Sequence, residues 1–131
     1  MRIRGEPYRS IFVASDGWTV AVIDQTRLPF ALEVRHLRTT THAAEAIRDM
    51  VVRGAPLIGV TAAYGVALGM REDATDAGLE RAVDLLGRTR PTAVNLRWAL
   101  ARMADALRAE SPSARVERAY AEASRIAEQD V

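Results

Sequence analysis

Two arginine-containing turns carry the residues best suited to chemistry. The first lies in the stretch VVRGAPLIGVTAAYGVALGM, where Arg53 precedes Gly54, Ala55 and Pro56. Proline is favoured at the first position of a helix because its missing N–H would have no partner there. We therefore expect a helix to begin at Pro56. Its first free N–H groups, the positive end of its dipole and the guanidinium of Arg53 would together suit an anion.

The second turn reads RPTAVN and begins at Arg90. Thr92 can cap a following helix, and Asn95 stands three residues later, where a side chain can reach back to the cap. The residue before a proline is held extended, which directs Arg90 away from that helix. One interpretation is a capped turn with a solvated arginine. The other is a clamp, in which Arg53 and Arg90 hold one phosphorylated ligand, because guanidinium groups match phosphate oxygens.

Nucleotide-binding signatures are incomplete in this chain. Gly54 and Gly59 have the glycine spacing of a P-loop, but Val60 and Thr61 stand where lysine followed by serine or threonine is required. The G-x-G-x-x-G fingerprint of dinucleotide-binding proteins does not occur. Neither class of nucleotide site is therefore predicted.

Metal and acid/base sites are not predicted either. His36 and His42 lack the spacing of metal ligands and are expected at the surface. The acidic residues between positions 72 and 84 are expected to be a solvated helix face, and no two carboxylates form an acid/base couple. We predict no catalytic residue, no metal and no cofactor in this chain.

Composition limits the class of protein. The chain has 131 residues, 49% hydrophobic and 27% charged, which fits one globular domain. All 18 basic residues are arginine, and 17 acidic residues balance them, so a nucleic-acid footprint is not expected. Cysteine is absent, which excludes disulfides and thiolate chemistry. No apolar segment follows the basic N-terminus as in a signal peptide, so we expect a cytoplasmic location.

Three strands are predicted before residue 38. They cover Tyr8–Ala14, Trp18–Asp24 and Phe30–Leu37, and the first two are joined by the hairpin signal Ser15-Asp16-Gly17. Apolar residues alternate along the third. We expect a small, mostly antiparallel sheet.

A bundle of about five helices is predicted over residues 40–131, which makes the fold α+β, with the sheet in about 1–38. Thr39, Thr40 or Thr41 could cap the first helix. Apolar residues recur at helical spacing within residues 43–51, 56–70, 79–87, 93–109 and 116–127.

The second of these helices contains Gly59, Gly65 and Gly69, each unfavourable in a helix interior. We interpret them as points of close approach to neighbouring helices around a central, buried helix. A membrane span is the alternative. The uncharged run 54–70 is shorter than the ~20 residues a span needs and contains a turn, so we favour the buried helix.

Three stretches carry a family resemblance: VIDQTRLP, IRDMVVRGAPLIGVTAAYGVALG and RPTAVNLRWAL. They resemble the N-terminal region of the methylthioribose-1-phosphate isomerases, whose superfamily includes the alpha, beta and delta subunits of translation initiation factor 2B. The resemblance covers essentially the whole chain. It implies that residues 1–131 are the N-terminal domain of a two-domain isomerase, whose larger Rossmann-like domain is absent from this chain.

The resemblance also implies a reaction, the conversion of 5-methylthioribose 1-phosphate to 5-methylthioribulose 1-phosphate in methionine salvage. The substrate-binding residues carried over from the family are Arg53, Gly54, Ala55 and Arg90. The family's catalytic cysteine and aspartate belong to the second domain, so this chain alone is expected to be inactive. Oxidation at C2 balances reduction at C1, and no redox cofactor is expected.

The partners implied are a sugar phosphate, the protein's own second domain and a second copy in a homodimer of the full-length protein, without nucleic acid or membrane. The last helix has no stop signal before Val131, so we expect the natural chain to continue. Exposed apolar residues are then expected near both arginine turns. Two alternatives stay open, a related ribose-phosphate isomerase and a non-catalytic regulatory subunit that binds protein partners.

Overall fold

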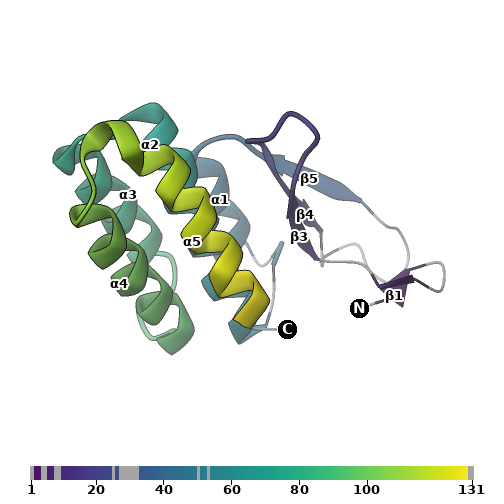
Figure 1. The fold of residues 1–131 in the computed structure, drawn as a ribbon. Coiled ribbons are helices and arrows are strands. Elements are labelled where there is room, and N and C mark those ends of the chain that lie inside the picture. The colour runs from purple at the N-terminus through teal and green to yellow at the C-terminus, as the bar shows by residue number, and fades with distance from the viewer. Residues whose placement is uncertain are drawn as a thin grey trace.

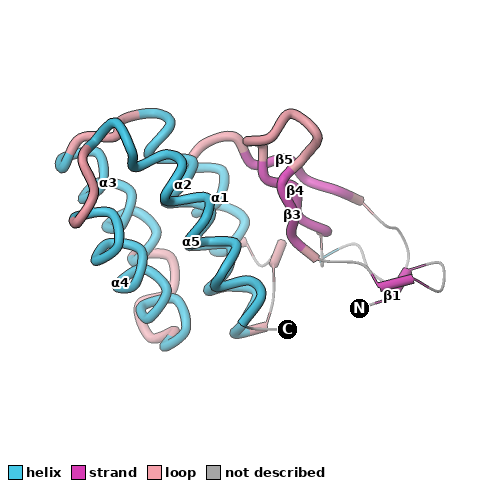
Figure 2. Tube along the Cα trace, in the orientation of Figure 1, coloured by secondary structure: helices cyan, strands magenta, loops and turns pink. Residues whose placement is uncertain are grey.

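The computed structural model describes residues 2–3, 6–7, 10–24, 26, 33–49, 51–52 and 54–129. Its described strands lie within residues 2–37, and its described helices of more than one turn lie within 40–129 (Figure 1). Figure 2 shows the strands gathered beside one flank of the helical bundle. The α+β fold predicted from the sequence is confirmed.

A three-stranded antiparallel sheet has β4 (Val20–Ile23) at its centre, between β3 (Ile11–Val13) and β5 (Val34–Leu37). The three predicted strands are confirmed with shorter ends, while residues 8, 9 and 30–32 of the predictions lie outside the described residues. All four residues of β4 are buried, because the strand is paired on both edges and covered on both faces.

Two features of the N-terminal region need separate mention. A short antiparallel pair, β1 (Arg2–Ile3) and β2 (Glu6–Pro7), precedes the sheet and was not expected from the sequence. The predicted hairpin turn between β3 and β4 is present. There the Asp16 carboxylate accepts backbone N–H groups at 2.9 and 2.8 Å, and Gly17 takes a φ of 84°.

All five predicted helices are present. They are α1 (Thr40–Arg48), α2 (Ala55–Glu72), α3 (Asp76–Gly87), α4 (Val94–Arg108) and α5 (Arg115–Gln129), with one 3-10 turn, η2 (Pro112–Ala114), before α5. Thr39 caps α1 through a bond from the His42 N–H, so the capping residue is the first of the three threonines.

Helix α2 is the core of the bundle, and its residues 58–70 are all buried. A methyl group on Gly65 would lie 2.9 Å from the Ala43 Cβ of α1, and one on Gly69 would lie 2.6 Å from the Thr40 hydroxyl. The glycines are therefore points of close approach, as the sequence predicted. None of the described helices combines the length and apolar character that a membrane crossing requires.

The sheet is fastened to the bundle near the β3–β4 hairpin. The Tyr120 hydroxyl of α5 donates to the Trp18 carbonyl at 2.7 Å, and the Arg71 guanidinium lies 4.3 Å from the centre of the Trp18 ring. Burial raises the pKa of Tyr120 to about 12. This phenol therefore remains a neutral donor throughout the physiological range.

Candidate functional site

The start of α2 leaves backbone N–H groups open. Gly54 is its N-cap with a φ of 92°, a conformation that glycine adopts without strain, and it has no side chain to cap the helix. The first helical bond runs from the Ile58 N–H to the Gly54 carbonyl at 3.0 Å. The Ala55 and Leu57 N–H groups lie before that bond, so they have no helical acceptor.

The same helix start is exposed to solvent. Gly54, Ala55 and Pro56 are all exposed, and no atom lies within 4 Å of the position that a Cβ on Gly54 would take. The helix begins at Ala55, one residue before the predicted start. Arg53 lies outside the described residues, so its predicted contact with a ligand stays a prediction.

Arg90 lies in the loop between α3 and α4 and is half-buried. Its Nε–H donates to the carbonyl of Ile47 in the last turn of α1, at 3.2 Å. This bond holds the guanidinium against a buried part of α1. Because Nε alone is used in it, the two terminal amino groups can face an anionic ligand.

The predicted cap of α4 is wrong. The N-cap is Ala93 and not Thr92, and no side chain makes a capping hydrogen bond there. The Ala93 N–H donates to the Arg90 carbonyl at 3.0 Å, which closes a turn with Thr92 inside it. The Ala93 carbonyl then accepts the first helical bond, from Arg97. Asn95 therefore stands two residues after the cap, and no reciprocal capping box can form.

The structure brings the two turns to the same end of the bundle. Helices α2 and α4 both begin at the end where α5 finishes (Figure 1). They touch near their starts, since a methyl group on Gly59 would lie 3.1 Å from the Asn95 carbonyl oxygen. The bond from Arg90 to Ile47 joins this end to α1. Two helix N-termini and an arginine therefore converge, as an anion site requires.

The charges along this part of the chain agree with an anion site. Between Asp84 and Asp105 the sequence has no acidic residue but four arginines, at positions 88, 90, 97 and 102. Arg88 pairs with Asp84 at 2.7 Å. The loop and first turns of α4 thus keep an excess of positive charge, which raises the local concentration of anions.

Two large apolar side chains are exposed on α4. Val94, at the helix start, is 67% exposed, and Trp98, one turn later, is 47% exposed. The Arg102 guanidinium lies 5.4 Å from the Trp98 ring centre and donates to the buried carboxylate of Glu122 at 2.7 Å. Val94 and Trp98 agree with the expectation of exposed apolar residues at the second arginine turn, and no large apolar side chain of the described residues is exposed at the start of α2.

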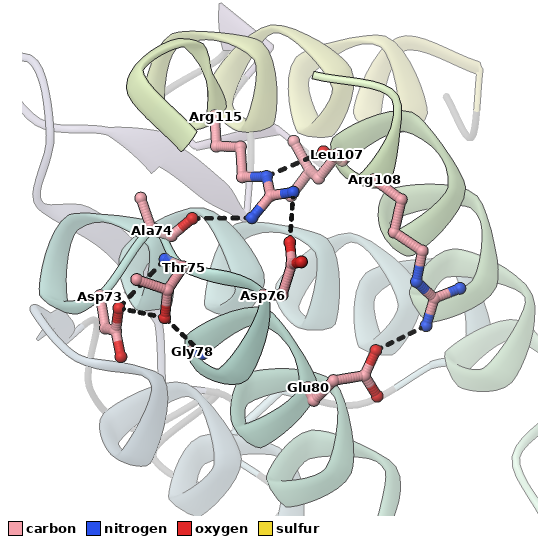
Figure 3. Close-up of polar contacts among 9 residues, drawn as sticks. All are labelled: Asp73, Ala74, Thr75, Asp76, Gly78, Glu80, Leu107, Arg108 and Arg115. Carbon is pink, nitrogen blue, oxygen red and sulfur yellow. Dashed lines mark hydrogen bonds and ion pairs between the residues drawn. The ribbon is translucent and has the colours of Figure 1, made fainter. Parts of the chain in front are cut away.

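The sequence analysis missed Arg115, which is almost fully buried although arginines are mostly exposed. Figure 3 shows its guanidinium between three elements. It donates to the Leu107 carbonyl of α4 at 2.9 Å, the Ala74 carbonyl before α3 at 2.9 Å, and the Asp76 carboxylate at 2.7 Å. The sequence Ser-Pro-Ser-Ala-Arg gave no signal of these contacts.

The other charged residues take structural or solvated positions. His36 and His42 are exposed, as predicted, and the His42 Nδ1 accepts from a backbone N–H at 3.0 Å. Hydrogen bonds from the Thr75 side chain and backbone lower the pKa of Asp73. Within the described ranges, no three histidine, aspartate or glutamate side chains gather closely enough to hold a metal ion.

A groove of about 520 Å³ lies between α3 and α4, lined by Val83, Leu100 and Ala104 with charged residues at its rim. None of its lining residues belongs to the predicted site set. Both signs of charge rim it, including Asp84, Asp105 and Arg108. We therefore place the candidate site at the two helix starts and not in this groove.

The fold is an α+β protein in which a small antiparallel sheet lies beside a helical bundle whose central helix is buried over residues 58–70. Comparison with known proteins identifies the family. Residues 51–131, more than half of the chain, match the model of the initiation factor 2 subunit family. The chain belongs to this family.

Individual relatives fall into two functional groups. A methylthioribose-1-phosphate isomerase of Methylobacterium nodulans is 65% identical over the whole of this chain. The solved structure of 5-methylthioribose 1-phosphate isomerase from Pyrococcus horikoshii is 33% identical, with a TM-score of 0.83 over 92% of this chain. The delta subunit of translation initiation factor eIF-2B from A. fulgidus is 40% identical, with a TM-score of 0.84 over 94%.

These relatives are longer than the chain. It spans 36% of the M. nodulans protein, 36% of the P. horikoshii chain and 37% of the A. fulgidus chain.

Proposed function

We propose that the full-length protein is an aldose–ketose isomerase acting on 5-methylthioribose 1-phosphate, and that residues 1–131 are its N-terminal domain. The geometric observation that carries this proposal is the convergence of the two turns at one end of the bundle. The name of the 65% identical M. nodulans relative supplies the substrate. A sugar phosphate meets the chemical requirement of this end, which offers N–H donors and positive charge to an anion.

In this proposal each site residue binds substrate. The Gly54 and Ala55 backbone lies at the open start of α2, where N–H groups can donate to phosphate or sugar oxygens. Arg90 has its Nε fixed on Ile47 and presents its terminal amino groups as a fork. Arg53, outside the described residues, is proposed as the second cation on the strength of the RGAP motif. Neutralisation from two sides would hold the phosphate in one orientation.

The chemical step would need groups from elsewhere. Conversion of the aldose to the ketose moves hydrogen between C2 and C1, so that C2 is oxidised and C1 is reduced. The sequence has no cysteine, and the family resemblance assigns the catalytic cysteine and aspartate to the second domain. We propose that this domain packs against the exposed Val94 and Trp98, next to the binding turns, since active sites often lie between domains. We also propose that the full-length protein is a homodimer located in the cytoplasm.

A regulatory role is the second candidate. The eIF-2B delta subunit has a TM-score of 0.84 against 0.83 for the isomerase from P. horikoshii, and its sequence identity to this chain is 40% against 33%. The curated relatives at 57–65% identity all have the isomerase name, which favours the enzyme. A related ribose-phosphate isomerase is the third candidate and would bind phosphate in the same way.

Incubation of the full-length protein with 5-methylthioribose 1-phosphate tests these candidates, with NMR detection of the ketose product. Formation of 5-methylthioribulose 1-phosphate is the expected result. Preferred turnover of a ribose phosphate that lacks the methylthio group would favour the related isomerase. No turnover of either compound by the folded protein would contradict an enzymatic function and favour the regulatory subunit.

A further inference from the structure

We propose that Gly59 is a positioning residue that sets the separation of the two ligand-binding turns. This inference rests on the proposed function. Gly59 lies in the second turn of α2, five residues after Gly54, and it faces Asn95 in the first turn of α4, five residues after Arg90. The contact is therefore equally distant along the chain from both binding turns.

The contact leaves no free space for a side chain. A methyl group on Gly59 would lie 3.1 Å from the Asn95 carbonyl oxygen and 3.6 Å from both its carbonyl carbon and its Cβ. The two carbon contacts are of ordinary length, but contacts between a C–H carbon and a carbonyl oxygen are usually about 3.3–3.6 Å, so the contact with the oxygen is too short. The nearest atom belongs to the helix backbone and cannot rotate away as the end of a side chain can. To accept alanine at position 59, the start of α4 would therefore have to move from α2 by a few tenths of an ångström.

Such a displacement would act directly on the binding geometry. Arg90 is joined to α4 by a turn of three residues, closed by the bond from the Ala93 N–H to its carbonyl. A shift of the α4 start therefore moves this turn relative to the N–H groups at Gly54 and Ala55. Two groups that hold one small ligand tolerate little change in separation, and misplacements near 1 Å can cost about 100-fold.

Gly65 offers a matched control in the same helix. A methyl group there would lie 2.9 Å from the Ala43 Cβ of α1 and 3.0 Å from the Leu86 side chain of α3. The clash is at least as close as the one at Gly59, but its neighbours are not in α4. Gly65→Ala should therefore disturb packing against α1 and α3 without a direct clash with the start of α4.

The experiment compares wild-type, Gly59→Ala and Gly65→Ala full-length proteins in two assays. The first is the KM and kcat for 5-methylthioribose 1-phosphate, and the second is calorimetric affinity for inorganic phosphate, with thermal midpoints measured in parallel. For Gly59→Ala we expect KM to rise about tenfold, with a smaller change in kcat and weaker phosphate binding, as for a loss of uniform binding. Gly65→Ala should lower the thermal midpoint and change KM and phosphate affinity less than Gly59→Ala does, because its clash reaches Arg90 only through α1 and α3.

Three results would overturn the inference: unchanged KM and phosphate affinity in Gly59→Ala, equal losses in both variants, or failure of Gly59→Ala to fold while Gly65→Ala folds. The last two would show that the contact serves stability and not position. A wild-type protein without isomerase activity would refute the proposed function instead. The comparison of phosphate affinities would then still decide whether Gly59 positions the two turns.

Discussion

Arg90 has one structural bond and, in our proposal, a ligand-binding role. Replacement by alanine in the full-length protein removes a charge-assisted contact with substrate, worth about 1.5–3 kcal/mol. We expect kcat/KM for 5-methylthioribose 1-phosphate to fall about 10- to 100-fold, as measured by steady-state kinetics. The same loss is expected for Arg53→Ala from the sequence motif.

Arg88→Ala is the control for the arginine variant. Arg88 is two residues away, its side chain is 77% exposed, and it pairs with Asp84 within α3 and its cap. Exposed pairs of this type contribute about 0–1 kcal/mol, so kcat/KM should stay within about twofold of wild type. Equal losses in Arg88→Ala and Arg90→Ala would indicate a general effect of positive charge and contradict a specific contact by Arg90.

Gly54 supplies the left-handed backbone that opens α2. With a φ of 92° and a ψ of 134°, alanine at this position strains the backbone by about 1–3 kcal/mol, although the space around it is open. We expect Gly54→Ala to lower the free energy of unfolding by that amount and to raise KM, because relief of the strain redirects the helix N–H groups. Denaturant titration and substrate kinetics measure the two effects.

Gly17→Ala separates strain from site geometry. Gly17 has a similar φ of 84° in the β3–β4 hairpin and also has no atom near the position of a Cβ. Gly17→Ala should lower the free energy of unfolding by a similar amount and leave KM unchanged. A rise in KM in both variants would mean that lost stability, and not the start of α2, controls substrate binding.

At the scale of elements, local patterns in the sequence predicted most helices and strands. The helical period and the three threonines at 39–41 located α1, although the sequence did not say which of them caps it, and glycine spacing indicated the central position of α2. The prediction of Thr92 as the cap of α4 was wrong because sequence patterns recognise a capping residue by its type. The observed cap, Ala93, depends instead on a turn closed by the hydrogen bond between Arg90 and Ala93. Such a turn is set by the packing of α3 and α4, which residue types do not encode locally.

Arg115 links three elements that local patterns treat separately (Figure 3). Arg115→Ala would remove the guanidinium that donates to the Leu107 and Ala74 carbonyls. Each lost partner of a buried group costs about 1–3 kcal/mol, so we expect the free energy of unfolding to fall by about 2–4 kcal/mol. Chemical denaturation followed by circular dichroism measures this free energy of unfolding.

Arg108→Ala is the matched control in the same region. Arg108 pairs with Glu80 at 2.8 Å, and both side chains are more than half exposed. Its loss should cost less than about 1 kcal/mol. If the two variants were equally stable, the three hydrogen bonds of Arg115 would contribute no more than a surface pair, and the role of Arg115 in linking these elements would be wrong.

At the scale of the whole molecule, the attachment of sheet to bundle depends on Tyr120. Tyr120→Phe removes the bond to the Trp18 carbonyl, and we expect a loss of about 0.5–1.5 kcal/mol near neutral pH. The pKa of this phenol is about 12 in the folded protein and about 10 when unfolded. The folded state therefore prefers the protonated phenol, and this contribution is complete below about pH 10.

Above pH 10 the unfolded phenol ionises first, so this part of the stability is lost as pH rises toward 12. The stability difference between wild type and Tyr120→Phe should therefore shrink between pH 10 and 12. Urea titrations across this range measure it. A difference that stays constant would contradict the burial of Tyr120 against the hairpin.

The candidate site shows where prediction from sequence stops. The RGAP and RPTAVNL motifs predicted Gly54, Ala55 and Arg90 as site residues one turn at a time, because each motif is a local stretch of sequence. Their convergence depends on how α2 packs against α4, through the contact between Gly59 and Asn95. The anchoring of Arg90 on α1 spans 43 residues and likewise has no local signal.

The last prediction follows from the proposal that residues 1–131 bind substrate and that the second domain carries out the chemical step. We expect residues 1–131 alone to show no isomerase activity with 5-methylthioribose 1-phosphate under conditions where the full-length protein turns over. Groups that bind phosphate stabilise substrate and transition state alike, so they lower KM without supplying the hydrogen transfer. Product formation by NMR, with equal molar amounts of the two proteins, measures it.

Circular dichroism of the short protein is the control for this comparison, since an unfolded chain would also be inactive. A folded, inactive chain that still binds inorganic phosphate would support the assignment of binding to the two turns and of chemistry to the second domain. Turnover by residues 1–131 at the full-length rate would contradict both assignments. It would require a catalytic group in this chain, among side chains in which we find no acid/base couple and no cysteine.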